Sequence, residues 1–171
     1  MLMYHPAQDI NHCVYRILLV LENTEHKSLS IDVYRLIDFY TVFPYLLRLI
    51  NPLPKPINKH RKIFFNIPEP FESLKNTKRI MHELELLQTV AFQNLLAKNF
   101  LCREAFEKGI IQRSLSKLPL ELSESLEVSR LAQEEWFKAI INDFPRAKFI
   151  GKSGIKARTG LMEYKYDMEK P

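Results

Sequence analysis

Apolar residues recur at helical spacing directly after Asp9. Val14, Leu18 and Leu21 form one stripe, and further apolar side chains widen it on both sides. The carboxylate of Asp9 can cap the first turn of such a helix. The pattern therefore predicts a helix over residues 11–22 that lies centrally in the core.

A second apolar stripe begins after Ser30 or Asp32, and either side chain can cap the helix that carries it. The stripe continues at intervals of three or four residues as far as Phe43. Pro44 follows at once, and a proline inside a helical pattern removes a backbone donor. We expect a kink or a break there, after which the chain resumes at residues 45–50.

Two further amphipathic stretches predict helices in the second half of the chain. One runs from Thr77 to about Lys98 with a regular apolar face. The other starts at Ser123 or Ser125 and ends just before Pro145. It is expected to be a single long helix, with Val128, Leu131, Ala132, Trp136, Ala139 and Ile140 on its buried face.

The segments between these helices are less regular. Residues 51–70 contain five prolines and a basic cluster, and are expected to form a connector draped over the surface, with a short strand at residues 63–65. Gly109 predicts the end of a short helix, followed by a brief strand at residues 110–111.

Glycines and cations are concentrated near the C-terminus. Three of the four glycines lie within residues 149–166. Apolar and polar side chains alternate over residues 161–166. Glycine punctuation with period-two alternation is typical of a β-hairpin. We therefore expect a basic hairpin, or wing, in this segment.

Together these elements predict a mainly α protein with a small β-hairpin, of winged-helix-like α+β type. A chain of 171 residues can bury one substantial core, and we expect a single domain. Its segments are N-terminal helices (1–50), a proline-rich basic connector (51–76), a helical core (77–144), and the basic wing with its tail (145–171).

Charge narrows the range of partners. The net charge is +5, and residues 146–165 alone contain six basic side chains and one acidic side chain, which also gives +5. Clustered lysine and arginine suit an anionic surface such as a nucleic acid or an acidic protein. The chain shows neither a secretory signal nor an apolar run of membrane-spanning length. Cys13 and Cys102 are expected to be reduced and buried, which favours a cytoplasmic location.

Partial motifs for catalysis are incomplete. Gly151-Lys152-Ser153 matches the end of a phosphate-binding loop, but Arg146 occupies the position of its first glycine. His82-Glu83 begins a zinc-protease motif, but Leu86 replaces the second histidine. The five histidines lack metal-ligand spacing and are expected to have surface or capping roles. We expect no catalytic residue, no metal and no cofactor.

The remaining polar candidates have simple structural interpretations. Cys13 follows His12 on a core-facing helix, and neighbouring side chains on a helix diverge by about 100°, so they are not expected to form a catalytic pair. Asp32 and Asp38 are expected to be capping or solvated carboxylates.

Two sets of residues are candidates for partner binding. The cations expected to contact DNA or an acidic partner are Lys59, Arg61, Lys62, Lys152, Lys156, Arg158 and Lys165. The alternative for these cations is simple solvation. The aromatic residues Tyr34, Phe39 and Tyr45 do not share one helix face, so some could form a protein interface. An aromatic stripe in the core is the alternative.

Four blocks of the chain occur in a recognisable order. They are Tyr4-His5-Pro6; Asp9 with His12-Cys13-Val14-Tyr15-Arg16-Ile17-Leu18; Arg35-Leu36-Ile37-Asp38-Phe39-Tyr40-Thr41-Val42-Phe43-Pro44; and Gly154-Ile155-Lys156-Ala157-Arg158-Thr159-Gly160-Leu161-Met162-Glu163-Tyr164. In these blocks the chain resembles the middle components of bacterial ABC-three-component systems, of which Lamassu-type defence systems are the best-known members. Residues 55–114 contribute little to the resemblance.

The resemblance implies a non-enzymatic accessory subunit. Such a subunit would bind an SMC-like ABC ATPase and help to couple the sensing of foreign DNA to an effector, often a nuclease. A free-standing winged-helix DNA-binding regulator is the alternative, and a small enzyme with a scattered active site is a third hypothesis. The acidic residues early in the last predicted helix, among them Glu121, Glu124 and Glu127, argue against that helix as a recognition helix.

Overall fold

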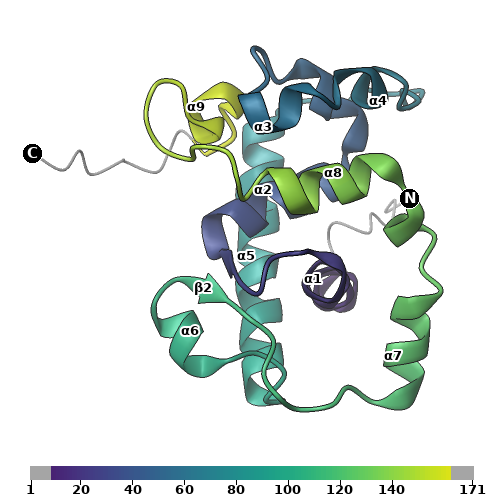
Figure 1. The fold of residues 1–171 in the computed structure, drawn as a ribbon, viewed down its shortest axis with the longest axis vertical. Helices are drawn as coiled ribbons and strands as arrows, with labels where there is room; N and C mark the ends of the chain where they lie inside the picture. The colour runs from purple at the N-terminus through teal and green to yellow at the C-terminus, as the bar shows by residue number, and fades with distance from the viewer. Residues whose placement is uncertain (1–8, 163–171) are drawn as a thin grey trace, which may run out of the picture.

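Helix α1 (Ile10–Asn23) lies at the centre of the fold and packs across α5 (Thr77–Ala97), the longest helix of the described chain (Figure 1). The computed structural model describes residues 9–162. The Asp9 carboxylate accepts hydrogen bonds from the backbone amides of Asn11 and His12, which confirms it as the N-cap. Residues 16–20 are all buried, so the helix is covered on every side, as expected for a central core helix.

Helix α2 (Ile31–Val42) begins where the sequence predicts. The Ser30 hydroxyl accepts a hydrogen bond from the amide of Val33 and so caps it. The helix ends before Pro44, and the chain continues as the 3₁₀ helix η2 (Pro44–Leu49). The predicted break at Pro44 is confirmed. The residue that caps α5 is Asn76 rather than Thr77.

The connector after residue 50 contains two short helices, α3 (Lys55–Asn58) and α4 (Arg61–Phe65). The strand expected at residues 63–65 is therefore wrong. Ile57 and Phe64 are fully buried, and α4 packs against both η2 and α8 (Glu135–Asp143). Helical turns pair the backbone groups of this segment with one another, whereas a strand at residues 63–65 would need a neighbouring strand, and the sheet of the described chain consists of other residues.

The β structure of the described chain is one two-stranded antiparallel sheet. Strand β1 (Leu29–Ser30) pairs with β2 (Ile110–Ile111), and Leu29 lies opposite Ile111. Helix α6 (Arg103–Glu107) precedes β2 and ends before Gly109, as predicted. The expectation of a mainly helical chain with a small β element is confirmed, but the paired strands are distant in the sequence.

The last predicted helix is divided. Helix α7 (Leu120–Glu127), the 3₁₀ helix η3 (Leu131–Gln133) and α8 replace a single long helix. Helix α7 packs on α1, whereas α8 packs on α1, α2, α3 and α4. The chain must turn between these two sites, and Val128, expected on the buried face, is 79% exposed at the turn.

The prediction of a basic wing after residue 145 is wrong for residues 145–162, which the structure describes. A loop leads into a short helix, α9 (Ile155–Thr159), and Gly160 ends that helix in the left-handed conformation. Ile155, Leu161 and Met162 are buried in the core. The predicted hairpin residues 163–166 lie outside the described residues.

The buried apolar side chains form one cluster that extends from Cys13 to Met162. Cys13 is buried as expected, whereas Cys102 is half-buried, so the expectation that it is buried is wrong; both are free cysteines. Within residues 9–162, no helix has both the length and the apolar character needed to cross a membrane.

Candidate functional site

A buried carboxylate joins the two basic parts of the chain. Asp143, the last residue of α8, is only 4% exposed. Its Oδ2 atom lies 2.6 Å from His60 Nε2 and 3.4 Å from Lys59 Nζ. Its Oδ1 atom accepts a hydrogen bond of 2.8 Å from Arg146 Nη1. The carboxylate therefore bridges the link between α3 and α4 on one side and the segment after α8 on the other.

The environment of Asp143 favours its charged form. Burial alone would raise the pKa of this carboxyl group. The hydrogen bonds from His60 and Arg146, together with the Lys59 ammonium group, outweigh that effect and hold the pKa of Asp143 below its usual value. Arg146 also donates to Glu25, 2.8 Å away, so part of its charge is already balanced.

A further contact ties α9 to the start of the connector. Arg158 donates to the backbone oxygen of Pro52 at 2.6 Å and to that of Ser153 at 2.8 Å. Figure 1 shows α3, α4 and α9 together at one end of the molecule, beside α8. Residues 55–62 and 144–162 thus lie together, and they contain nine lysine and arginine residues without a single aspartate or glutamate.

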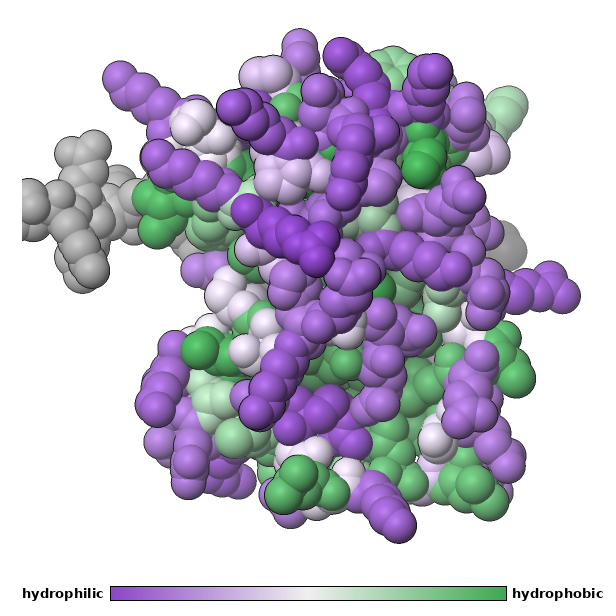
Figure 2. All heavy atoms as spheres, viewed as in Figure 1, coloured by the Kyte–Doolittle hydropathy of each residue, from purple (hydrophilic) through white to green (hydrophobic). Residues whose placement is uncertain are grey.

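We call the exposed cations of these two segments the cationic region. Its members are Lys55, Lys59, Arg61, Lys62, Arg146, Lys148 and Lys152. Figure 2 shows hydrophilic residues over most of the surface above α3, α8 and α9, whereas hydrophobic residues gather around α7. The arrangement provides several ammonium and guanidinium groups in one neighbourhood, as a polyanion requires.

The predicted cations of the C-terminal segment have different environments. Lys152 is exposed in the loop before α9. Lys156, by contrast, is 8% exposed, and Arg158 is half-buried with its guanidinium group on backbone oxygens. Burial leaves Lys156 little surface for the expected partner contact. Arg158 ties α9 to the connector through these backbone oxygens, and its expected role in partner binding stays a prediction. Lys165 lies outside the described residues.

The prediction of an aromatic protein interface is wrong for two of its three residues. Tyr34 and Phe39 are both 0% exposed. Tyr34 packs edge-on against Phe92 of α5, and Phe39 packs against Tyr40 and Phe43. A helix with core on several sides buries aromatic side chains that do not share one stripe. Tyr45 is half-buried, and its hydroxyl accepts a hydrogen bond of 2.9 Å from the amide of Leu74.

A second buried polar cluster links three helices. Arg16 of α1 donates to both oxygens of Asp38 on α2, through Nε at 2.5 Å and Nη2 at 3.2 Å. Gln88 of α5 donates to the same carboxylate at 2.7 Å. Asp38 is 0% exposed, so its expected surface role is wrong. Burial lowers the pKa of Arg16, but the charge of Asp38 and its hydrogen bonds outweigh this and raise that pKa overall.

The comparison with protein families covers nearly the whole chain. A family model, ABC-three component (ABC-3C) system Middle Component 5, matches residues 2–167. The chain belongs to this family. No curated protein and no solved structure matches the middle component.

Two of the blocks that carry the family resemblance meet in the structure of this middle component. Arg16 lies in one block and Asp38 in another, and the two form the buried ion pair at the junction of α1 and α2. Within residues 9–162, no group of three or more His, Cys, Asp or Glu side chains is arranged to hold a metal ion. The most distinctive polar chemistry of these blocks is thus a contact between helices.

Sequence reasoning missed the partners of both buried carboxylates. A signal was present for Asp38, because it is flanked on both sides by apolar residues that fill the helix. A carboxylate in such a run must be paired when the helix is buried. The sequence signal for a paired carboxylate was weaker at Asp143, which is the only acidic residue between Lys138 and Lys148. Its hydrogen-bond partner His60 lies 83 residues earlier in the chain, so no local sequence pattern reveals the contact.

Proposed function

We propose that this middle component is a non-enzymatic accessory subunit of a Lamassu-type defence complex that acts against phage or plasmid DNA. In this role it bridges an SMC-like ABC ATPase and a nuclease-type effector, close to DNA. Membership of the ABC-3C middle-component family supports a role within a multi-component system. The convergence of two basic segments on Asp143 is the single structural observation that carries the DNA-facing part of the proposal.

The chemistry of the cationic region suits a phosphate backbone rather than a specific base sequence. Its exposed cations belong to short helices and a loop, and Lys62 of α4, Lys148 and Lys152 are all exposed. Ammonium groups on flexible stems neutralise phosphates and release counterions without reading bases. The expected interaction is therefore independent of sequence and strongly dependent on salt.

The test is a salt titration of DNA binding by the complete complex. The middle component is co-expressed with the ABC component and the third component of its own system, and the affinity for a duplex of mixed sequence is measured at several salt concentrations. The variant Lys62→Gln/Lys148→Gln/Lys152→Gln is expected to bind more weakly. Its salt slope is expected to fall by about 0.9 for each phosphate that the variant no longer neutralises.

A matched control removes the same number of charges elsewhere. Lys98, Lys108 and Lys117 are exposed residues outside residues 55–62 and 144–162, and their triple change to Gln alters net charge equally. This control is expected to leave the salt slope unchanged. Equal slopes for the wild-type complex and the first variant would refute a DNA contact at the cationic region, and failure of the three components to associate would refute the subunit role.

A further inference from the structure

Helix α5 contains the longest stretch of the chain without a charged residue. Residues 86–97 have no aspartate, glutamate, lysine or arginine, although 26% of the whole chain is charged. The stretch forms about three turns of the longest helix that the structure describes. A surface helix normally has charged residues on its solvent side, and a helix without them is normally covered on all sides.

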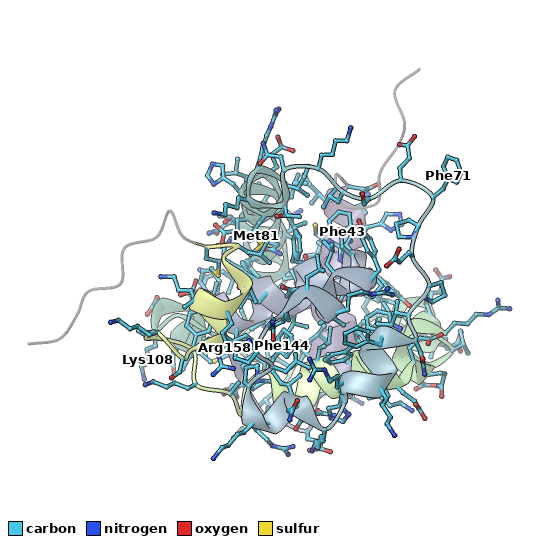
Figure 3. All side chains as sticks on the ribbon, turned by 90° about the horizontal axis from the view of Figure 1, so that it is seen from above. Phe43, Phe71, Met81, Lys108, Phe144 and Arg158 are labelled. Atoms are coloured by element: carbon cyan, nitrogen blue, oxygen red, sulfur yellow. The ribbon has the colours of Figure 1, made fainter. Side chains whose placement is uncertain are left out.

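One side of this stretch is not covered by the described chain. Helices α1 and α2 pack against the opposite side. Figure 3 shows α5 at the edge of the molecule, with the buried Met81 on its inner side. We call the uncharged and exposed outer side chains the neutral face; they are Leu86, Thr89, Val90, Gln93, Asn94 and Ala97. Leu86 is 60% exposed and Val90 is 43% exposed, so burial of this face would release free energy.

Charged groups border the neutral face without entering it. Arg79 and Glu83, which precede it on α5, pair with each other at 2.9 Å. Arg35 of α2 reaches one edge, where it donates to the Thr89 hydroxyl at 3.1 Å and to the α5 backbone at 2.9 Å. The next cation along α5 is Lys98, after the stretch ends. A surface that covers residues 86–97 therefore meets neutral side chains and is expected to be neutral itself.

The spacing of the neutral face makes it self-complementary. Leu86, Val90, Gln93 and Ala97 are separated by four, three and four residues, so they form one seam along the helix. A second α5 can lie antiparallel on this seam, about a twofold axis level with residues 91 and 92. Leu86 then lies opposite Ala97 of the second copy, and Val90 lies opposite Gln93. The largest side chain thus faces the smallest, as in well-packed helix pairs.

We propose that the neutral face binds the same face of a second copy of this chain, with the two α5 helices antiparallel. A twofold contact joins identical surfaces, so an uncharged face meets an uncharged face and no like charges are brought together. The seam is only about 17 Å long, so the dimer is expected to be weak, with a dissociation constant on the order of 10–100 μM. This inference is independent of the proposed role in DNA binding.

The experiment measures self-association of the purified full chain by sedimentation equilibrium, from about 1 μM to about 1 mM. The apparent mass is expected to rise with concentration from 20.2 kDa towards twice that value. Val90→Lys places two ammonium groups near each other across the seam, and is expected to weaken the dimer by about tenfold or more. The matched control is Val128→Lys, which adds the same charge at an exposed valine (79%) outside α5. It is expected to dimerise as the wild type does.

Disulfide cross-linking tests the antiparallel register. With Cys102→Ser in the background, Leu86→Cys/Ala97→Cys is expected to link two chains on mild oxidation, and peptide mapping should find position 86 joined to position 97. Within one chain these positions lie about 17 Å apart along the helix, which is too far for a disulfide. Leu86→Cys alone is the control, and it should not cross-link because the two copies of position 86 are also about 17 Å apart along the helix axis.

Three results would overturn the proposal. The first is a wild-type mass of 20.2 kDa over the whole concentration range. The second is efficient cross-linking of Leu86→Cys alone, which would indicate parallel helices. The third is a monomeric wild type that binds the ABC component more tightly than Val90→Lys does, because the neutral face would then belong to a different partner. Thermal unfolding of every variant checks that the fold is retained.

Discussion

Arg16 and Asp38 form a buried ion pair in which the guanidinium group of α1 donates to both oxygens of a carboxylate on α2. Gln88 of α5 donates to one of the same oxygens, so three helices share one polar contact. Replacement of one member of a buried pair leaves an uncompensated charge, which is costly.

Asp38→Asn is accordingly expected to lower the free energy of unfolding by about 3–5 kcal/mol. Urea denaturation followed by the fluorescence of Trp136 measures the change. Glu124→Gln on the exposed side of α7 is a suitable control and should stay within about 0.5 kcal/mol of the wild type. A loss below about 1 kcal/mol in Asp38→Asn would show that the pair contributes little to stability.

The pH dependence of stability is expected to report on Asp143. Because hydrogen bonds from His60 and Arg146 lower the pKa of this carboxyl group below 3.8 in the folded chain, the folded state binds its proton less readily than the unfolded state. The stabilisation is complete at pH values above 3.8 and is lost as the pH falls through the lowered pKa. Denaturation curves from pH 6 to pH 2 should therefore show a steeper loss for the wild type than for Asp143→Asn.

The same substitution also tests the link between the basic segments. Asp143→Asn should cost about 1.5–3 kcal/mol at pH 7, the usual contribution of hydrogen bonds to a charged group. Parallel pH profiles for the two proteins would exclude the assigned role of the carboxylate.

The two thiols are expected to differ in reactivity. Burial raises the pKa of Cys13 from 9.0 to about 11, and the nearby charge of Asp38 acts in the same direction. The reactive thiolate is therefore scarce at pH 8. Cys102 is half-buried and should react with a disulfide reagent well before Cys13 does. The variant Cys102→Ser shows which labelling signal belongs to which thiol. Rapid modification of Cys13 in the native protein would contradict this expectation.

A methyl group at Gly154 should destabilise the start of α9. A Cβ atom there would lie 2.3 Å from the backbone oxygen of Phe149 and 2.7 Å from that of Ile150. Backbone atoms cannot move aside as a flexible side chain can, so Gly154→Ala is expected to cost about 1–3 kcal/mol. Thermal unfolding measures the loss, with Ser153→Ala in the exposed loop as the control. An unchanged midpoint would mean that the loop relaxes freely.

The sequence predicted those elements that depend on local signals. Asp9 and Ser30 cap helices with their own side chains. Pro44 follows the end of α2, because proline has no backbone N–H to donate to the helix. Gly109 likewise precedes the predicted strand β2. These features need no knowledge of distant residues, which is why they could be found in the chain alone.

The errors come from contacts between distant segments. The glycines near the C-terminus suggested a hairpin, but Gly154 is required by its close approach to the Phe149 carbonyl group before a helix. The long helix expected over residues 123–144 is divided because its two halves pack on different neighbours. At the candidate site, Lys59 and Lys152 were identified from the sequence as candidate binding cations, whereas the carboxylate of Asp143 that joins their segments was not.

Asp143 also determines how the cationic region can respond to a ligand. Because one carboxylate holds Lys59, His60 and Arg146, the connector and the segment after α8 are fixed relative to each other before any anion arrives. A bound polyanion would then meet a prearranged set of charges and would lose little of its binding free energy to immobilising them. Helix α8 in turn contacts α1 and α2, so both segments are also fixed to the helices at the centre of the molecule.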